Sequence, residues 1–349
     1  MEKLTEPPAT AYQDYEPDAA RLKKKLYLPT LEDHVIPKTM LELSQRLGGG
    51  TYSDTNVGHY NSFKVAVTRI TLRIHDNQVT KETLNWMKEE VWVLSRQRHR
   101  HIVPILGICV EDRLPYIISE FVDGQSVKYI IQNNADSLQW PQKVKISLQA
   151  ADGMAYLHTC TPPILHRDLR CANIFISENE NVKVGDFGLT KLIQPLREVC
   201  KNDECCCQGR LSSCPPSIRW TAPEVLKNPV THETDSDSPL TIYSDVYSFG
   251  VCMWELATGS DPFSECTEQE VCELVKRGSR PDSLVSIEIL PQYKALMHQC
   301  WNSIPENRPK FKQIATRLKD LMSSARSYQK NLSVKKRQKK VEIQTDVKT

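Results

Sequence analysis

The sequence has no apolar stretch of about 18 residues, the minimum for a membrane-spanning helix. It also lacks the apolar core of a signal peptide, because its first residues, MEKLTEPPATAYQDYEPD, are charged and contain proline. No internal repeat is present. The first two absences favour a cytoplasmic protein without a transmembrane segment.

Neither sign of charge dominates, since 45 basic residues stand against 43 acidic ones and the formal net charge is +2. Nucleic acid is therefore not the expected partner. One basic patch is local: the tail SVKKRQKKVEIQTDVKT has five basic residues between Lys335 and Lys340. We expect a solvated, disordered tail. The alternatives are a nuclear address or a contact with anionic surfaces.

The chain has 12 cysteines, which we expect to be reduced thiols in a cytoplasmic protein. Five of them gather in the polar stretch CKNDECCCQGRLSSC, between Cys200 and Cys214. Adjacent cysteines rarely all point at one ion, so we favour a thiol-rich loop over a zinc or redox site.

The organisation of the chain changes near residue 40. Residues 1–39 are charged and contain proline without an apolar period, which indicates a loosely ordered leader. Short runs rich in Val, Ile and Tyr then predict strands, and apolar residues at helical spacing predict a helix over residues 81–97. Helical periodicity dominates the second half. The sequence therefore predicts an α+β fold, with a β-rich lobe over residues 40–124, a helical lobe over residues 125–322 and a tail over residues 323–349.

Five motifs follow in a fixed order: ILHRDLRCANIFI, VKVGDFGLT, RWTAPE, SDVYSFG and CWNSIPENRP. Together they resemble the motif set of eukaryotic protein kinases, and the resemblance covers roughly residues 40–322. It implies the bilobal protein kinase fold, with a five-stranded N-lobe, a helical C-lobe, and ATP bound in the cleft.

The same resemblance implies which residues carry the chemistry. Asp168 would be the catalytic residue that accepts or orients the proton of the substrate hydroxyl, and Arg167 would steady the activation segment. Asn173 and Asp186 would hold Mg²⁺ with hard oxygen ligands. The alternative, in which these residues only cap loops and turns, is disfavoured by the ordered motifs.

The glycine-rich stretch LGGGTYS resembles the loop that covers the phosphates of ATP in kinases. Gly48 and Gly50 match two of its glycines, where missing side chains let backbone N–H groups approach the phosphates. Ser53 replaces the third glycine, which reduces flexibility without forbidding nucleotide binding.

The adenine side of the expected pocket matches the family. IISEFVDG resembles the kinase hinge, with Ser119 as a small gatekeeper. The backbones of Glu120 and Val122 would face the purine, and Ala66 would pack on its ring.

One expected residue is missing. The third-strand lysine of kinases is replaced by Thr68, the last residue of VAVT, so the matching helix glutamate, Glu90, loses its usual partner. Arg69 points to the opposite face of the strand, and Lys64 lies about 13 Å away along it. Neither is a good substitute. The loss of such an anchor would cost roughly 10²–10³ in rate.

The acceptor hydroxyl is ambiguous. HRDLRCAN with Arg170 and RWTAPE with Trp220 resemble the corresponding motifs of tyrosine kinases. PSIRW instead resembles tyrosine-kinase-like Ser/Thr enzymes, and Ser217 would match their threonine near the catalytic aspartate. No tyrosine lies between Asp186 and Glu224, which leaves Ser212, Ser213 and Ser217 as candidates for activating phosphorylation.

Two functions therefore compete. The first is a slow, ATP-dependent protein kinase acting on a protein substrate, and the second is a pseudokinase that serves as a nucleotide-binding scaffold or allosteric partner. The surviving base and metal positions favour the kinase.

Overall fold

The chain is described by a computed structural model that covers residues 34–49, 53–70, 79–133, 138–193, 217–227, 240–281 and 289–346. Two compact units emerge. The first contains residues up to 125 together with 156–168 and 175–218, and the second contains residues 126–155, 169–174 and those from 219 onward. Each unit is described by itself.

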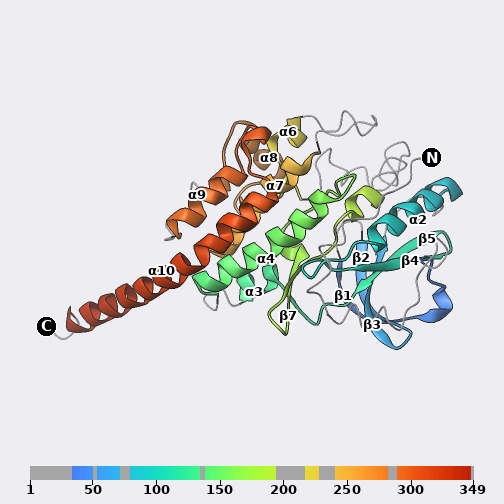
Figure 1. Ribbon diagram of the computed structural model, residues 1–349, viewed down its shortest axis with the longest axis horizontal. Coiled ribbons are helices and arrows are strands. Elements are labelled where there is room, and N and C mark those ends of the chain that lie inside the picture. The colour runs from blue at the N-terminus through green and yellow to red at the C-terminus, as the bar shows by residue number, and fades with distance from the viewer. Residues whose placement is uncertain are drawn as a thin grey trace. The chain divides into compact units, whose positions relative to one another are not determined.

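The first unit is built on a five-stranded antiparallel sheet in the order β1-β2-β3-β5-β4 (Figure 1). Its strands are β1 (Leu41–Gly49), β2 (Ser53–Tyr60), β3 (Phe63–Ile70), β4 (Ile105–Glu111) and β5 (Leu114–Glu120). Three short strands, β6 (Gly124–Ser126), β7 (Ile174–Ser177) and β8 (Val182–Val184), form a second sheet.

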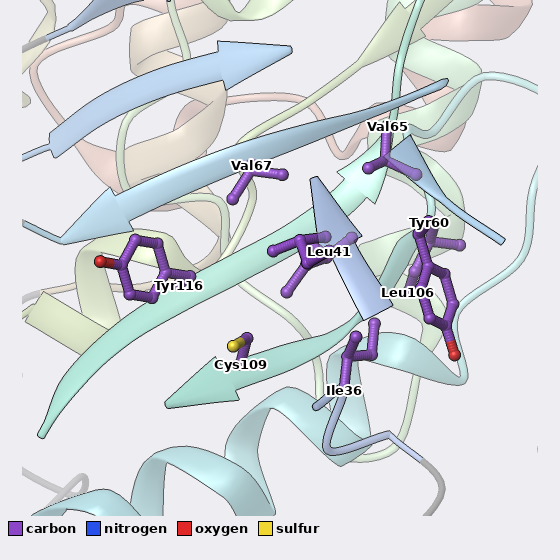
Figure 2. Packing of buried hydrophobic residues seen from close by; sticks show 9 residues of the cluster. Ile36, Leu41, Tyr60, Val65, Val67, Leu106, Cys109 and Tyr116 are labelled. Carbon is purple, nitrogen blue, oxygen red and sulfur yellow. The ribbon is translucent and has the colours of Figure 1, made fainter. Parts of the chain in front are cut away.

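Strict alternation in β3 decides which residues face the core of the first unit. Val65 and Val67 are fully buried in a cluster with residues of the other strands, including Leu41, Tyr60 and Leu106 (Figure 2). Because side chains in a strand alternate between faces, Ala66 and Thr68 occupy the opposite face. The hydrophobic pattern therefore fixes the face of β3 on which Thr68 lies, paired with Thr55 of β2 and Ile117 of β5.

Helix α2 (Lys81–Ser95) packs against β4 of the same unit. The Thr80 side chain caps its N-terminus by accepting a hydrogen bond from the N–H of Thr83, at 3.1 Å. Its buried residues recur at helical spacing and form one face: Leu84, Met87, Val91 and Leu94. Glu90 lies next to this buried face.

The end of the expected leader is built into the sheet. Val35 forms a parallel bridge with Ile108 of β4, and backbone hydrogen bonds of 2.8 Å join Ile108 to His34 and Ile36. A Cβ on Gly107 would lie 2.2 Å from the His34 carbonyl oxygen, so glycine is required for this close approach. Residues 34–37 thus extend the edge of the sheet, in contrast to the loosely ordered segment that composition indicates.

The second unit is helical (Figure 1). Its elements are α3 (Val127–Asn133), η4 (Cys171–Asn173), α6 (Pro223–Lys227), α7 (Ile242–Thr258), α8 (Glu268–Lys276), α9 (Pro291–Cys300), η7 (Pro305–Asn307) and α10 (Phe311–Asp346). Helix α4 (Trp140–Thr159) begins in this unit, and η5 (Ile218–Trp220) ends in it. Helix α7 is buried along most of its length, and α9 packs against both α7 and α10.

Two details fix the ends of α7. A capping box joins Thr241 and Ser244 at its start, and Gly259 adopts a left-handed conformation at its end, with φ of 74°.

In the described parts of the chain, no helix is both long enough and apolar enough to span a bilayer. A β-rich part and a helical part confirm the predicted α+β class.

Helix α10 continues through Asp346, whereas composition indicates a disordered tail from residue 323. Its first half is anchored by packing, since Leu318 and Ala325 are fully buried. No glycine or proline follows Pro309, so nothing in the sequence terminates the helix. The basic side chains from Lys335 to Lys340 lie outside the described side chains, and their proposed contacts stay predictions.

Candidate active site

Asp168 lies half-buried in the loop that resembles the kinase catalytic loop. The hydroxyl of Ser217 donates a hydrogen bond to Oδ1 of Asp168, and both residues belong to the first unit. The N–H of Asp168 donates to Nδ1 of the buried His166, at 3.3 Å. The preceding residue, Arg167, has a φ of 67°, a conformation that a non-glycine residue adopts only at some cost in energy. The loop therefore presents the Asp168 carboxylate in a fixed position.

Asp186 follows β8 and is exposed, with a φ of 58°. The next side chain, Phe187, is fully buried, so the aspartate is turned toward solvent while the phenylalanine anchors the loop. Gly188, with φ of 75°, packs so closely on α2 that a Cβ there would lie 2.9 Å from the side chain of Leu94. The segment that carries Asp186 is thus held against α2.

Asn173 is the second residue expected to bind Mg²⁺. It ends η4 in the second unit, where its side chain is 4% exposed and its N–H donates to the Arg170 carbonyl at 2.9 Å. An exposed carboxylate at Asp186 and an amide oxygen at Asn173 are hard ligands of the kind that Mg²⁺ prefers. The residue types present fit the metal.

The expected purine-binding residues lie on adjacent strands. Ala66 of β3 and Ser119 of β5 are register partners. The N–H of Glu120 donates to the Pro104 carbonyl at 3.0 Å, so that N–H is not available to a purine. Val122 is half-buried just beyond the end of β5.

Sequence reasoning missed a buried ion pair at this hinge. Nζ of Lys183 in β8 lies 2.7 Å from each carboxylate oxygen of Glu120, and both side chains are about one-tenth exposed. The two residues are 63 positions apart, and no local pattern connects them. The pair joins the hinge to the strand that leads into Asp186.

Thr68, which the sequence predicts to replace the third-strand lysine of kinases, is 6% exposed. Its hydroxyl lies 3.1 Å from that of Thr55, its register partner on β2, so a hydrogen bond joins the two. Arg69 is exposed, and alternation places it on the opposite face. Nζ of Lys64 lies 3.8 Å from the ring centroid of Phe121 and is engaged there. That neither cation replaces the third-strand lysine stays a prediction.

Glu90 nevertheless has a cationic partner. Nζ of Lys191 lies 2.7 Å from its Oε1. Lys191 comes five residues after Asp186, in a helical turn where its N–H donates to the Gly188 carbonyl at 3.1 Å. Glu90 therefore pairs with a cation other than a third-strand lysine, and sequence reasoning did not identify this partner.

The glycine-rich loop is described only in part. Gly48 is exposed, and a Cβ built on it meets no atom within 4 Å, which leaves open space beside the backbone. Ser53 is half-buried and pairs with Ile70. Gly50 lies outside the described residues, as do Ser212, Ser213 and the cysteines from Cys200 to Cys214.

A second missed pair supports the kinase motifs in the second unit. The buried guanidinium of Arg308 contacts both carboxylate oxygens of Glu224, at 2.6 and 2.8 Å. The two residues come from RWTAPE and CWNSIPENRP, and their presence in those motifs was the signal that could have predicted the pair. Planar, two-point contacts of this type are strong and directional.

Comparisons with known proteins agree with this geometry. The chain matches the family described as "Protein tyrosine and serine/threonine kinase" over residues 41–318. It is similar to two Dictyostelium discoideum proteins: "Probable serine/threonine-protein kinase drkA", 31% identical over 90% of this chain, and "Dual specificity protein kinase splA", 31% identical over 84% of it. The chain spans only 44% and 12% of the lengths of these relatives. Protein kinases generally use ATP and Mg²⁺. With its fold and its ordered motifs, the chain belongs to the protein tyrosine and serine/threonine kinase family.

Proposed function

We propose that the chain is a slow, ATP-dependent protein kinase that transfers the γ-phosphate to a serine or threonine of a protein substrate. The hydrogen bond from Ser217 to Asp168 carries this proposal. It engages the expected catalytic carboxylate with the residue that matches the tyrosine-kinase-like Ser/Thr group. Relatives named as Ser/Thr and dual-specificity kinases support the same choice.

Each of these site residues would have its own role in phosphoryl transfer. Asp168 orients the acceptor hydroxyl and takes its proton, and Ser217 holds the carboxylate in place. Asn173 and Asp186 would hold Mg²⁺, which when bound neutralises charge on the phosphates. Positioning is the main requirement, because phosphoryl transfer needs little covalent participation from the protein.

The low rate follows from Thr68. A buried hydroxyl, hydrogen-bonded to Thr55, cannot supply the charged contact that the α- and β-phosphates receive from lysine in other kinases. A loss of roughly 10²–10³ in rate is the expected scale for one preorganised donor.

Phosphotransfer from labelled ATP to peptides that carry a single Ser, Thr or Tyr tests the proposal. We expect slow, Mg²⁺-dependent labelling of the Ser and Thr peptides and none above background with Asp168→Asn. Labelling of Tyr peptides alone would contradict the acceptor class. Labelling that survives Asp168→Asn would contradict the assigned base.

The second candidate function is that of a nucleotide-binding pseudokinase that acts as a scaffold or allosteric partner. The observation in its favour is that Glu90 pairs with Lys191 and the Thr68 hydroxyl with Thr55, so Glu90 orients no cation from β3 toward the α- and β-phosphates. Thermal unfolding with ATP and Mg²⁺ separates binding from catalysis, since a ligand of the native state raises the melting temperature with concentration. A rise without phosphotransfer would favour the pseudokinase.

A further inference from the structure

A short segment ahead of β1, residues 34–38, connects the edge of the sheet to helix α2 within the first unit; we call it the edge segment. Nε2 of His34 lies 2.7 Å from the backbone carbonyl oxygen of Lys88, in the middle of α2. A carbonyl oxygen only accepts hydrogen bonds, so Nε2 carries the proton and donates. We propose that His34 is a positioning residue, which ties α2, and with it Glu90, to the sheet.

The edge segment is fixed to the sheet by its backbone. Val35 forms a parallel bridge with Ile108 of β4, and hydrogen bonds of 2.8 Å join Ile108 to the residues on both sides of Val35. The side chain of Ile36 is 2% exposed and belongs to the hydrophobic cluster of Figure 2. At the end of the segment, Nζ of Lys38 lies 2.5 Å from Oε2 of Glu111. These contacts give the histidine at the start of the segment a rigid base.

The hydrogen bond from His34 to α2 is shielded from water, because His34 is only 3% exposed. Shielding strengthens such a bond relative to one in solvent. The Lys88 carbonyl has two lone pairs, so it can accept from the imidazole as well as from the N–H four residues further along the helix. The contact therefore tethers α2 without interrupting its own hydrogen bonds.

The position of α2 matters because the segment that carries Asp186 is held against it. Glu90 pairs with Lys191, five residues after Asp186. In the proposed function, on which this inference rests, no cation from β3 fixes Glu90 to the sheet. The apolar packing of α2 on β4 is non-directional, whereas a hydrogen bond selects one position. Lys88 and Glu90 are only about 3 Å apart along the helix axis, so His34 restrains this part of α2.

Two substitutions remove the tether from opposite sides. His34→Phe keeps an aromatic ring and removes the donor, whereas His34→Gln keeps an N–H group for the Lys88 carbonyl. Gly107→Ala leaves the imidazole intact but displaces the edge segment, because the three atoms nearest to a Cβ at Gly107 all belong to His34 and Ile36, the closest at 2.2 Å. His59→Phe, at an exposed position of β2, is the matched control.

Amide hydrogen exchange of the full-length protein tests the tether directly. In His34→Phe and Gly107→Ala, the amides of α2 should exchange roughly threefold to tenfold faster than in the wild type, because a lost hydrogen bond makes local opening easier. In His34→Gln and His59→Phe they should exchange as in the wild type. Unchanged protection of α2 in His34→Phe overturns the proposal, as does an equal loss of protection across the whole first unit. If His34→Phe does not fold, Gly107→Ala decides by the same criteria.

Phosphotransfer kinetics connect the tether to the positioning of Glu90. At saturating ATP and Mg²⁺, His34→Phe should lower kcat by roughly threefold to tenfold and leave the KM for ATP unchanged, because α2 moves and the expected purine-binding residues do not. His34→Gln should restore kcat. Faster exchange of α2 with an unchanged kcat would overturn the positioning role. A wild type without phosphotransfer would refute the proposed function, whereas the exchange of α2 would still confirm or overturn the tether.

Discussion

Lys191 donates a charged hydrogen bond to Glu90, with 2.7 Å between Nζ and Oε1. Both side chains are only partly exposed, at 33% and 22%, so the contact is less screened than a surface ion pair. Since Thr68 offers Glu90 no charge, this contact keeps the helix glutamate engaged with the segment that follows Asp186. If Thr68 alone is replaced by lysine, Lys191 still competes with the new lysine for Glu90.

Thr68→Lys is expected to raise phosphotransfer more in the Lys191→Ala background than alone. A returned charged contact contributes about 1–3 kcal/mol, or roughly fivefold to 150-fold in rate. Turnover of the wild type, both single variants and the double variant measures the difference. Asp186→Asn in the double variant is the control and should abolish the gain. Equal rates for Thr68→Lys with and without Lys191 would show that Lys191 does not compete.

Ser217→Ala should lower phosphotransfer by roughly tenfold or more, because a hydrogen bond to a charged group contributes about 1.5–3 kcal/mol. Ser217→Thr keeps a hydroxyl and should keep most of the activity. The nucleotide-dependent rise in melting temperature should be unchanged in both variants, since Ser217 contacts Asp168 rather than the expected purine residues. If Ser217→Ala is as active as the wild type, Ser217 does not position Asp168.

Lys183→Met should destabilise the protein by about 3–5 kcal/mol, because it leaves the Glu120 carboxylate buried without its cation. The double variant Lys183→Met/Glu120→Gln removes both charges and should lose much less. Urea unfolding of the single and double variants measures both effects. Equal losses would mean that the two charges are not coupled, contrary to the 2.7 Å contacts.

The strands and the long helices were predictable because the apolar period alone specifies them. Val65 and Val67 alternate with Ala66 and Thr68, and the face assigned to Thr68 follows directly. Asp168, Asp186 and Glu224 were identified by their motifs, which carry chemistry at fixed spacing. Local patterns also indicated a disordered tail, but helix propensity and the packing of Leu318 and Ala325 continue α10.

The ion pairs could not be predicted in the same way. Glu120 pairs with Lys183, and Glu90 with Lys191, across 63 and 101 residues. Both lysines sit in segments where a basic residue has no distinctive spacing. Only the three-dimensional arrangement selects these partners from the 45 basic residues of the chain. The sequence predicted that Thr68 replaces the third-strand lysine, but it did not predict which cation pairs with Glu90.

Protonation of His101 is expected to lower the stability of the folded protein in acid. Burial lowers its pKa to about 4, as do the neighbouring charges of Arg100 and Lys183, although the contact with the Val182 carbonyl opposes this shift. Since the unfolded imidazole titrates near 6.5, the unfolded state binds more protons between these two values. The contribution of neutral His101 is therefore full above about pH 6.5 and is lost progressively as the pH falls toward 4.

The matched variant is His101→Gln, whose amide can still donate to the Val182 carbonyl, 2.8 Å from Nδ1 in the wild type. Between about pH 7 and pH 4.5 the wild type should lose roughly 2–3 kcal/mol more stability than this variant. Urea unfolding at several pH values measures the difference, and His59→Gln at an exposed position serves as the control. Half-buried His99 also has its pKa lowered to about 4, first by burial and then by the neighbouring charges of His101 and Arg100, so the measured difference includes the part of the His99 shift that His101 causes. Parallel pH profiles for the wild type and His101→Gln would show that His101 is already protonated or exposed in the native state.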